Sequence, residues 1–130
     1  MPRFCRPLLL AALVLIGCGS PRKTAEATLR KVGVDRVRKE AAVLYKNLFA
    51  GPGPAFFTIK VNDCPSTFQA LSPLHVGAYR DGFSLAKMRT ADVEEGFYVI
   101  PLGMDVVPTS KDRAHFAPLA PGIYWYTFDL

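Results

Sequence analysis

Three side chains of this sequence could support nucleophilic chemistry: the thiol of Cys64 and the imidazoles of His75 and His115. A thiol nucleophile needs a histidine base within hydrogen-bond reach and a third group that orients the base, a role open to Asp63 or Asp112. No local signature of a thiol enzyme surrounds Cys64, and a lone cysteine is more often a small buried apolar residue. We therefore predict no catalytic residues and keep a small thiol- and histidine-dependent hydrolase as the alternative.

Metal binding is predicted to be absent for a related reason. Cys64, the one cysteine outside the predicted leader and lipidation site, and two histidines far apart in sequence are too few for a transition-metal site. Three acidic residues (Asp92, Glu94 and Glu95) precede a predicted strand and could hold a hard cation, but a solvated turn accounts for them more simply. The sequence thus predicts neither a metal nor a cofactor.

Ser84 and Lys87 match the Ser-x-x-Lys element of penicillin-recognising enzymes. That element works on a helix, where residues three apart share a face. Here it directly follows a predicted hairpin turn, and on a strand the two side chains point to opposite sides. We therefore reject a penicillin-type site.

The start of the chain is predicted to be a cleaved leader. Arg3 and Arg6 precede an unbroken apolar run, Leu8–Ile16. The run has nine residues, whereas a helix needs about 20 to cross a bilayer. A positive start followed by a short apolar segment and small residues is typical of a secretory signal peptide.

The leader ends in Leu15-Ile16-Gly17-Cys18, which resembles the lipobox of bacterial lipoproteins. The resemblance implies lipid transfer to the Cys18 thiol, cleavage before Cys18, and acylation of the new amino terminus. It predicts a signal peptide at 1–17, a lipidated tether at 18–22, and attachment to membrane lipid through Cys18. The protein would then lie on the exported side of the cell membrane or of an outer membrane.

Basic residues are concentrated near this anchor. The whole chain has a net charge of +5, and the segment from Arg22 to Lys46 holds eight basic and three acidic residues. Such a segment suits anionic headgroups, at about 1 kcal/mol for each basic residue near the surface; an ordinary solvated helix face fits it equally well. Nucleic acid is not a predicted partner, because the rest of the exported part is slightly acidic.

Apolar residues at helical spacing predict two helices, over 23–32 and 35–49, with a tight break at Gly33. A single helix weakened by glycine is the alternative. Ser20, followed by proline, and Thr24 are both candidate N-caps. The glycines and prolines of 51–54 end the helical part.

The later part of the chain predicts strands. Asp81-Gly82 predicts a hairpin with a type I′ turn, the stretch 65–71 a short helix, and 103–121 a long irregular loop. In the aromatic closing strand, Tyr124 shares one face with two other aromatics and Trp125 lies on the other face, where it could be exposed to a partner. Runs rich in aromatic and β-branched residues occur at 56–61, 74–80, 83–89, 96–100 and 122–130.

Together these patterns predict a single α+β domain over 23–130. Its helical segment, 23–49, packs on a small antiparallel sheet of about four strands within 55–130. The segment Cys64–Leu130 also resembles small bacterial proteins of uncharacterised activity, through its Pro-x-x-aromatic-x-x-Leu turn, hairpin and aromatic closing strand. The predicted function is a membrane-anchored, non-enzymatic binding or structural module of the cell envelope, with an envelope protein as a candidate partner.

Overall fold

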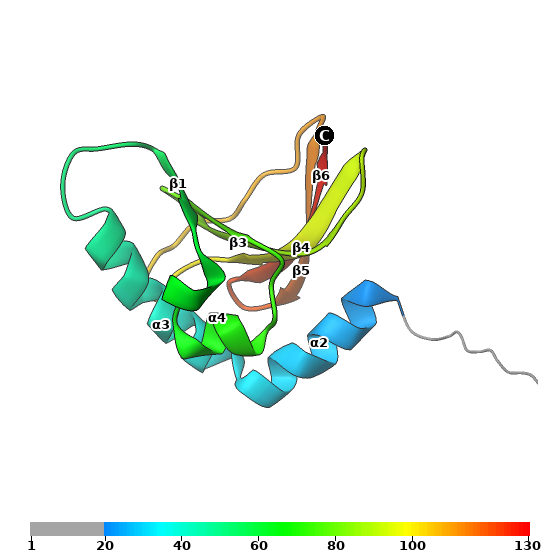
Figure 1. Ribbon diagram of the computed structural model, residues 1–130, viewed down its shortest axis with the longest axis horizontal. Coiled ribbons are helices and arrows are strands. Elements are labelled where there is room, and N and C mark those ends of the chain that lie inside the picture. Colours follow the sequence, from blue (N-terminus) through cyan, green and yellow to red (C-terminus); the bar gives the residue numbers. More distant parts are fainter. Residues whose placement is uncertain (1–19) are drawn as a thin grey trace, which may run out of the picture.

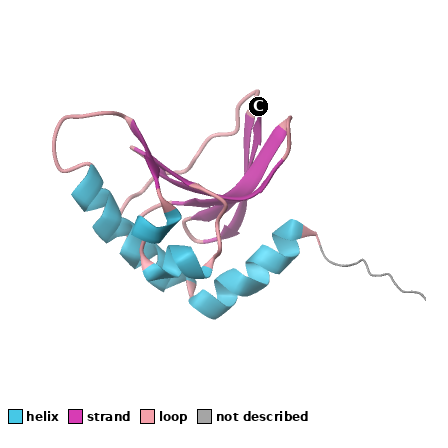
Figure 2. Cartoon of the chain, viewed as in Figure 1, coloured by secondary structure: helices cyan, strands magenta, loops and turns pink. Residues whose placement is uncertain are grey.

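The structure is a computed structural model that describes residues 20–130. It contains one antiparallel sheet with helices packed against one of its faces (Figures 1 and 2). The predicted signal peptide and Cys18 lie outside the described residues. Within 20–130, no helix is both long and apolar enough to span a bilayer.

The two N-terminal helices form where the apolar spacing predicts them. Helix α2 spans Pro21–Val32 and helix α3 spans Val34–Leu48. The Ser20 hydroxyl accepts a hydrogen bond from the amide of Lys23 at 3.2 Å, so Ser20 is the N-cap and α2 begins two residues earlier than expected. Gly33 separates the helices at a φ of 102°, a conformation that favours glycine. The break is confirmed, and the single-helix alternative is wrong.

The sheet has six strands rather than about four. Their order is β1-β2-β3-β4-β6-β5, and every pairing is antiparallel. The 3-10 helix η3 (Val61–Asp63) and the short helix α4 (Ser66–Ala70) connect β1 to β2. The strands are β1 (Phe56–Ile59), β2 (Val76–Tyr79), β3 (Gly82–Arg89), β4 (Val93–Val99), β5 (Ala114–Ala120) and β6 (Ile123–Asp129).

The prediction of an irregular loop over 103–121 missed strand β5. Proline lacks the amide that a ladder needs, so Pro118 made the segment look unsuitable for a strand. Strand β5 is at the edge of the sheet and pairs only with β6, and the register shifts between Pro118 and Ala120. An edge strand with a bulge tolerates proline because one side of the strand needs no partner.

The hairpin between β2 and β3 is confirmed, but its turn differs by one residue from the prediction. Tyr79 pairs with Gly82, which leaves Arg80 and Asp81 as the turn residues. Neither has a positive φ, so the turn is not type I′. Gly82 is needed for space instead, because a Cβ there would lie 2.8 Å from the carbonyl oxygen of Val99.

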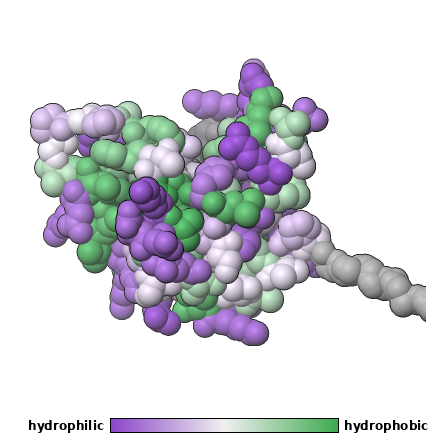
Figure 3. Space-filling view, in the orientation of Figure 1, coloured by the Kyte–Doolittle hydropathy of each residue, from purple (hydrophilic) through white to green (hydrophobic). Residues whose placement is uncertain are grey.

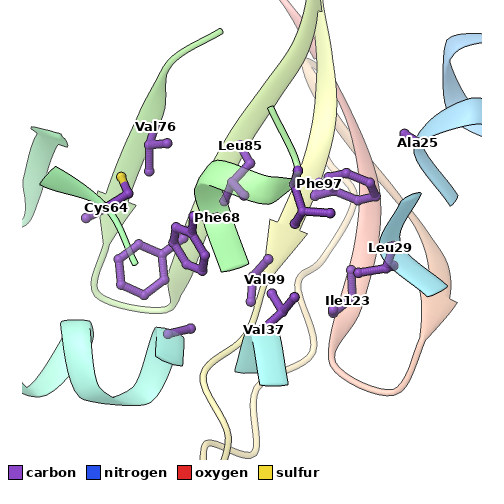
Figure 4. Packing of buried hydrophobic residues seen from close by; sticks show 14 of the residues in the cluster. Ala25, Leu29, Val37, Cys64, Phe68, Val76, Leu85, Phe97, Val99 and Ile123 are labelled. Atoms are coloured by element: carbon purple, nitrogen blue, oxygen red, sulfur yellow. The ribbon is translucent and has the colours of Figure 1, made fainter. Parts of the chain in front are cut away.

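Alternate residues of each strand face opposite sides of the sheet. The helix-covered face carries Phe97 and Trp125, which form a cross-strand pair, and Leu85 of β3. These side chains pack with Leu29 of α2 and Val37 of α3 into the main core, part of which is drawn in Figure 4. Trp125 is 4 % exposed, so the prediction that it could be exposed on a partner surface is wrong.

On the opposite face, called here the free face, no helix of residues 20–130 is packed. Tyr98, Ile100 and Tyr126 form a second buried cluster on it, and Met104 and Val106 of the connection between β4 and β5 pack over them. The connection therefore covers the part of the free face near the end of β4.

Hydrophilic residues are frequent along the lower edge of the molecule in Figure 3, where α2 and α3 lie. Lys31, Arg36 and Lys39 are exposed basic residues of these two helices. Arg38 is only partly exposed, because its guanidinium donates to the carbonyl oxygens of Ile100 (2.8 Å) and Pro101 (3.3 Å) and so joins α3 to the end of β4.

Candidate functional site

The free face holds a cavity of about 400 Å³, called here the sheet-face pocket. Its volume lies within the usual range for small-molecule sites. It spans five neighbouring strands, β1 to β4 and β6, so residues distant in sequence meet there. The lining residues are Phe56, Thr58, His75, Val76, Gly77, Tyr79, Ser84, Arg89, Glu94, Phe128 and Leu130.

The register explains how these residues come together. Thr58 pairs with Gly77, and Gly77 pairs with Ser84, so the three form one cross-strand row on the free face. A Cβ at Gly77 would lie 2.8 Å from the Ser84 hydroxyl oxygen and 3.2 Å from the ring of Phe56. A glycine is therefore required here, because the Ser84 hydroxyl and the Phe56 ring already lie too close for a side chain.

Glu94 supplies a buried carboxylate to this pocket. Its side chain is 7 % exposed, and burying a carboxylate is costly unless partners hold it. The Tyr126 hydroxyl donates to Oε2 at 2.7 Å, His75 Nε2 lies 2.8 Å from Oε1, and the Arg89 guanidinium lies 3.7 Å from the same oxygen. Both carboxylate oxygens thus already have protein partners.

The His75 contact with Glu94 is a close approach without a formed hydrogen bond. Nε2 is inaccessible to solvent and has no aligned hydrogen-bond partner within the described residues, despite its short distance from Glu94. Protonation of the imidazole would make the pair an ion pair. The rest of the His75 ring reaches the pocket, since 37 % of the side chain is exposed.

Two tyrosines place phenols beside the carboxylate and the serine. Burial raises the pKa of Tyr126, and the hydrogen bond to Glu94 and the charge of Glu94 raise it further. Burial likewise raises the pKa of Tyr79, while the Ser84 hydroxyl acts in the opposite direction on both phenols. Both tyrosines therefore remain protonated and can serve as hydrogen-bond donors.

This arrangement is suited to binding. A serine nucleophile would need a base on its hydroxyl, and no hydrogen bond joins Ser84 to His75 in the described part of the chain. The imidazole nitrogen that would serve is held against Glu94 instead. The pocket offers hydroxyls, an imidazole, a guanidinium and a carboxylate between aromatic walls.

Cys64 lies in a different region from His75. Its side chain is buried in the main core under the helices, beside Val76 and Phe68 (Figure 4), and its thiol donates to the carbonyl oxygen of Lys60 at 3.4 Å. Burial raises the pKa of this thiol to about 11, and the charge of Asp63 adds to the rise. A thiol nucleophile needs the opposite shift.

A second cavity, of about 310 Å³, lies beside Cys64 along α3. Its lining includes Val43, Leu44 and Asn47 from α3, and Pro65 after η3. Neither histidine lines it. The structure therefore does not bring the three candidate thiol-enzyme residues together, and His115 lies exposed on edge strand β5.

Ser84 and Lys87 point to different sides, as expected. Ser84 lines the pocket on the free face, while Lys87 Nζ donates to the carbonyl oxygens of Leu71 and Ser72 at the end of α4. Over residues 20–130, no group of three or more histidine, cysteine, aspartate or glutamate side chains is arranged to hold a metal ion.

The prediction of a solvated acidic turn is wrong for Glu94. Glu94 is not in a solvated turn: strand β4 begins at Val93, and Glu94 pairs with Phe128 on the free face. The sequence does contain a signal for this strand. Glu94, Gly96 and Tyr98 alternate with Val93, Glu95 and Phe97, as residues on the two faces of a strand do. Glu95, on the other face, accepts a hydrogen bond from the Trp125 indole at 2.8 Å.

Comparison with protein-family models, with curated proteins and with solved structures finds no match to this chain.

Proposed function

We propose that this protein is a lipid-anchored binding module of the cell envelope, and that the sheet-face pocket binds a small ligand. The observation that carries the proposal is the buried Glu94 carboxylate, which accepts a hydrogen bond from Tyr126 and lies 2.8 Å from His75 in a cavity of about 400 Å³. A fold gains no stability from desolvating a carboxylate where an apolar side chain would pack. Polar groups converging in a cavity are instead typical of a ligand site.

A thiol hydrolase is the less favoured function. The Cys64 thiol is buried with its pKa raised to about 11, and the cavity next to it contains no histidine. The sheet-face pocket in turn contains a histidine but no thiol. Non-covalent binding, in contrast, does not require the thiol and the histidine to lie in the same cavity.

The anchor rests on the lipobox resemblance at Cys18. Since α2 begins at Pro21, the domain would follow the lipid almost directly and stay near the headgroups. Replacing Cys18 with alanine should leave an unprocessed or soluble protein, as judged by membrane fractionation and mass. A Cys18→Ala protein that still fractionates with membranes and carries lipid mass would contradict the anchor.

The pocket can be tested before its ligand is known. A set of small molecules is screened for compounds that raise the melting temperature of the protein, because a ligand that binds only the folded state stabilises it. The rise in melting temperature that each hit causes is then measured with the variant Thr58→Trp, which places a large side chain at the exposed rim of the pocket. The matched control is Val43→Trp, at an exposed residue of the cavity beside Cys64.

The proposal expects that Thr58→Trp abolishes the stabilisation and that Val43→Trp keeps it. The reverse pattern would move the binding site to the cavity beside Cys64. Hits that stabilise both variants equally, or a screen without hits, would reject the sheet-face pocket as a binding site.

A further inference from the structure

We infer that the ligand of the sheet-face pocket is a neutral polyhydroxylated ring, which in chemical class is a saccharide unit. This inference rests on the proposed function and names its ligand. It follows from three properties of the pocket lining: its charges, its hydroxyl groups and its aromatic walls.

The charges disfavour ionic ligands of either sign. An anion would face the Glu94 carboxylate, which is 7 % exposed and so is poorly screened by water. A cation would have to displace the Tyr126 hydroxyl from one Glu94 oxygen or the His75 ring that lies 2.8 Å from the other, and would meet the Arg89 guanidinium nearby. A neutral ligand meets neither obstacle.

The polar groups disfavour a purely apolar ligand. Ser84, 2 % exposed, and Tyr79 bring neighbouring hydroxyls to the pocket, and Thr58 brings a third. Within residues 20–130, the Thr58 hydroxyl and the Arg89 guanidinium donate no hydrogen bond to the protein. An apolar ligand would remove water from these groups without replacing it, which costs free energy for each group left unpaired.

Aromatic rings stand at both ends of the pocket. At one end, Phe56 of β1 and Tyr79 of β2 lie with their centroids 5.0 Å apart. At the other end, Phe128 of β6 lines the pocket and packs on the fully buried ring of Tyr126, with the centroids 4.3 Å apart. Strands β3 and β4 lie between the two pairs in the sheet. The pocket therefore combines apolar aromatic surfaces with a polar middle.

A saccharide ring matches this combination. Each of its hydroxyls both donates and accepts, so it can satisfy hydroxyls, an imidazole and a guanidinium together. Its C–H groups form apolar patches that pack on aromatic faces. It carries no charge that would oppose Glu94 or Arg89.

Calorimetric titration of the purified protein tests this class directly. The neutral probes are the methyl glycosides of glucose, galactose, mannose and N-acetylglucosamine. The charged probes are methyl glucuronide and methyl 6-amino-6-deoxyglucoside, which keep the ring and add a negative or a positive charge. At least one neutral probe should bind at least tenfold more tightly than both charged probes.

Single substitutions at two exposed positions connect the binding to the pocket. Thr58→Val removes one hydroxyl while keeping the shape, and should weaken the best probe by about three- to tenfold, whereas Thr58→Ser should keep its affinity. Phe56→Leu should also weaken it, because an aromatic wall is lost. Circular dichroism spectra like that of the native protein would verify that the variants fold.

Equal or tighter binding of a charged probe would overturn the saccharide inference, and so would unchanged affinity in both Thr58→Val and Phe56→Leu. If every probe fails while other compounds bind in a manner sensitive to Thr58→Trp, the inference fails and the proposed function stands. If those compounds fail as well, both are wrong.

Discussion

The two faces of the sheet are built from alternate residues of the same strands, yet their chemistry differs. The helix-covered face has an apolar centre, where Phe97, Val99 and Ile123 are fully buried against the helices. The free face has its own buried aromatic cluster but opens into a pocket with a buried carboxylate and several hydroxyls. The difference indicates that the covered face supplies most of the stability, and that the free face can keep groups that stability does not require.

The largest expected effect comes from the covered face. Phe97→Ala should lower the free energy of unfolding by about 3–5 kcal/mol, because it leaves a cavity beside Trp125, whose ring centroid lies 5.6 Å from that of Phe97. Thr58→Val on the free face should change it by no more than about 0.5 kcal/mol. Urea denaturation measures both. Similar losses in the two variants would break the division between the faces.

A smaller loss of stability is expected at Gly82 of β3, which neighbouring backbone and side-chain atoms approach closely. Gly82→Val should destabilise the protein by about 1–3 kcal/mol, because the new Cβ would lie 2.8 Å from the Val99 carbonyl oxygen and from the Tyr98 ring. Gly53→Ala is the control, since a Cβ at Gly53 would meet nothing within 4 Å. Equal melting temperatures for the two variants would show that Val99 and Tyr98 do not pack closely against Gly82.

The strands and helices were readable from the sequence to different degrees. The α2–α3 break followed from Gly33, and the short helix before β2 from the apolar residues Phe68 and Leu71 three apart; both are buried. Strand β5 was hidden by Pro118, since an edge position is a property of the assembled sheet and not of the local segment.

The candidate site was largely hidden for the same reason. Thr58, Gly77, Ser84 and Glu94 meet only through the pairing of four strands, and no local motif marks them. The residues with conspicuous chemistry, Cys64 among them, could be named from the sequence but not placed. Which face of the closing strand the helices cover was also undetermined, because both of its faces are rich in aromatic residues.

The reactivity of the Cys64 thiol tests its burial on the covered face. With its pKa raised from 9.0 to about 11, the Cys64 thiol should hold about 100-fold less thiolate than in the unfolded chain at pH 8. It should therefore react with a disulfide reagent at least about 100-fold more slowly in the native protein than in denaturant. A native rate equal to the denatured one would revive the thiol-enzyme alternative.

The smallest effect concerns pH and the contact between α3 and α4. The Glu40 carboxylate accepts hydrogen bonds from the Thr67 amide at 3.0 Å and the Thr67 hydroxyl at 2.9 Å. Chiefly through the amide bond, its pKa lies below the usual 4.5. Because the folded pKa is the lower one, this contribution is present above about pH 4.5 and is lost as the pH falls through the folded value.

Denaturation of the native protein and of Glu40→Gln at pH 7 and pH 3 measures this contribution. The native protein should be the more stable of the two at pH 7, and the gap should shrink at pH 3. A gap that is constant with pH would show that the carboxylate charge contributes nothing to holding α4.

The most direct test of the account is to map where a bound ligand lies. Amide chemical shifts are recorded by NMR while the tightest-binding compound or glycoside is added to the native protein. The account predicts that the largest changes fall on the free face, at Gly77, Ser84 and Glu94, with little change along α2 and α3. Changes concentrated at Val43, Leu44 and Cys64 would contradict it, because they would place binding on the helix side of the sheet.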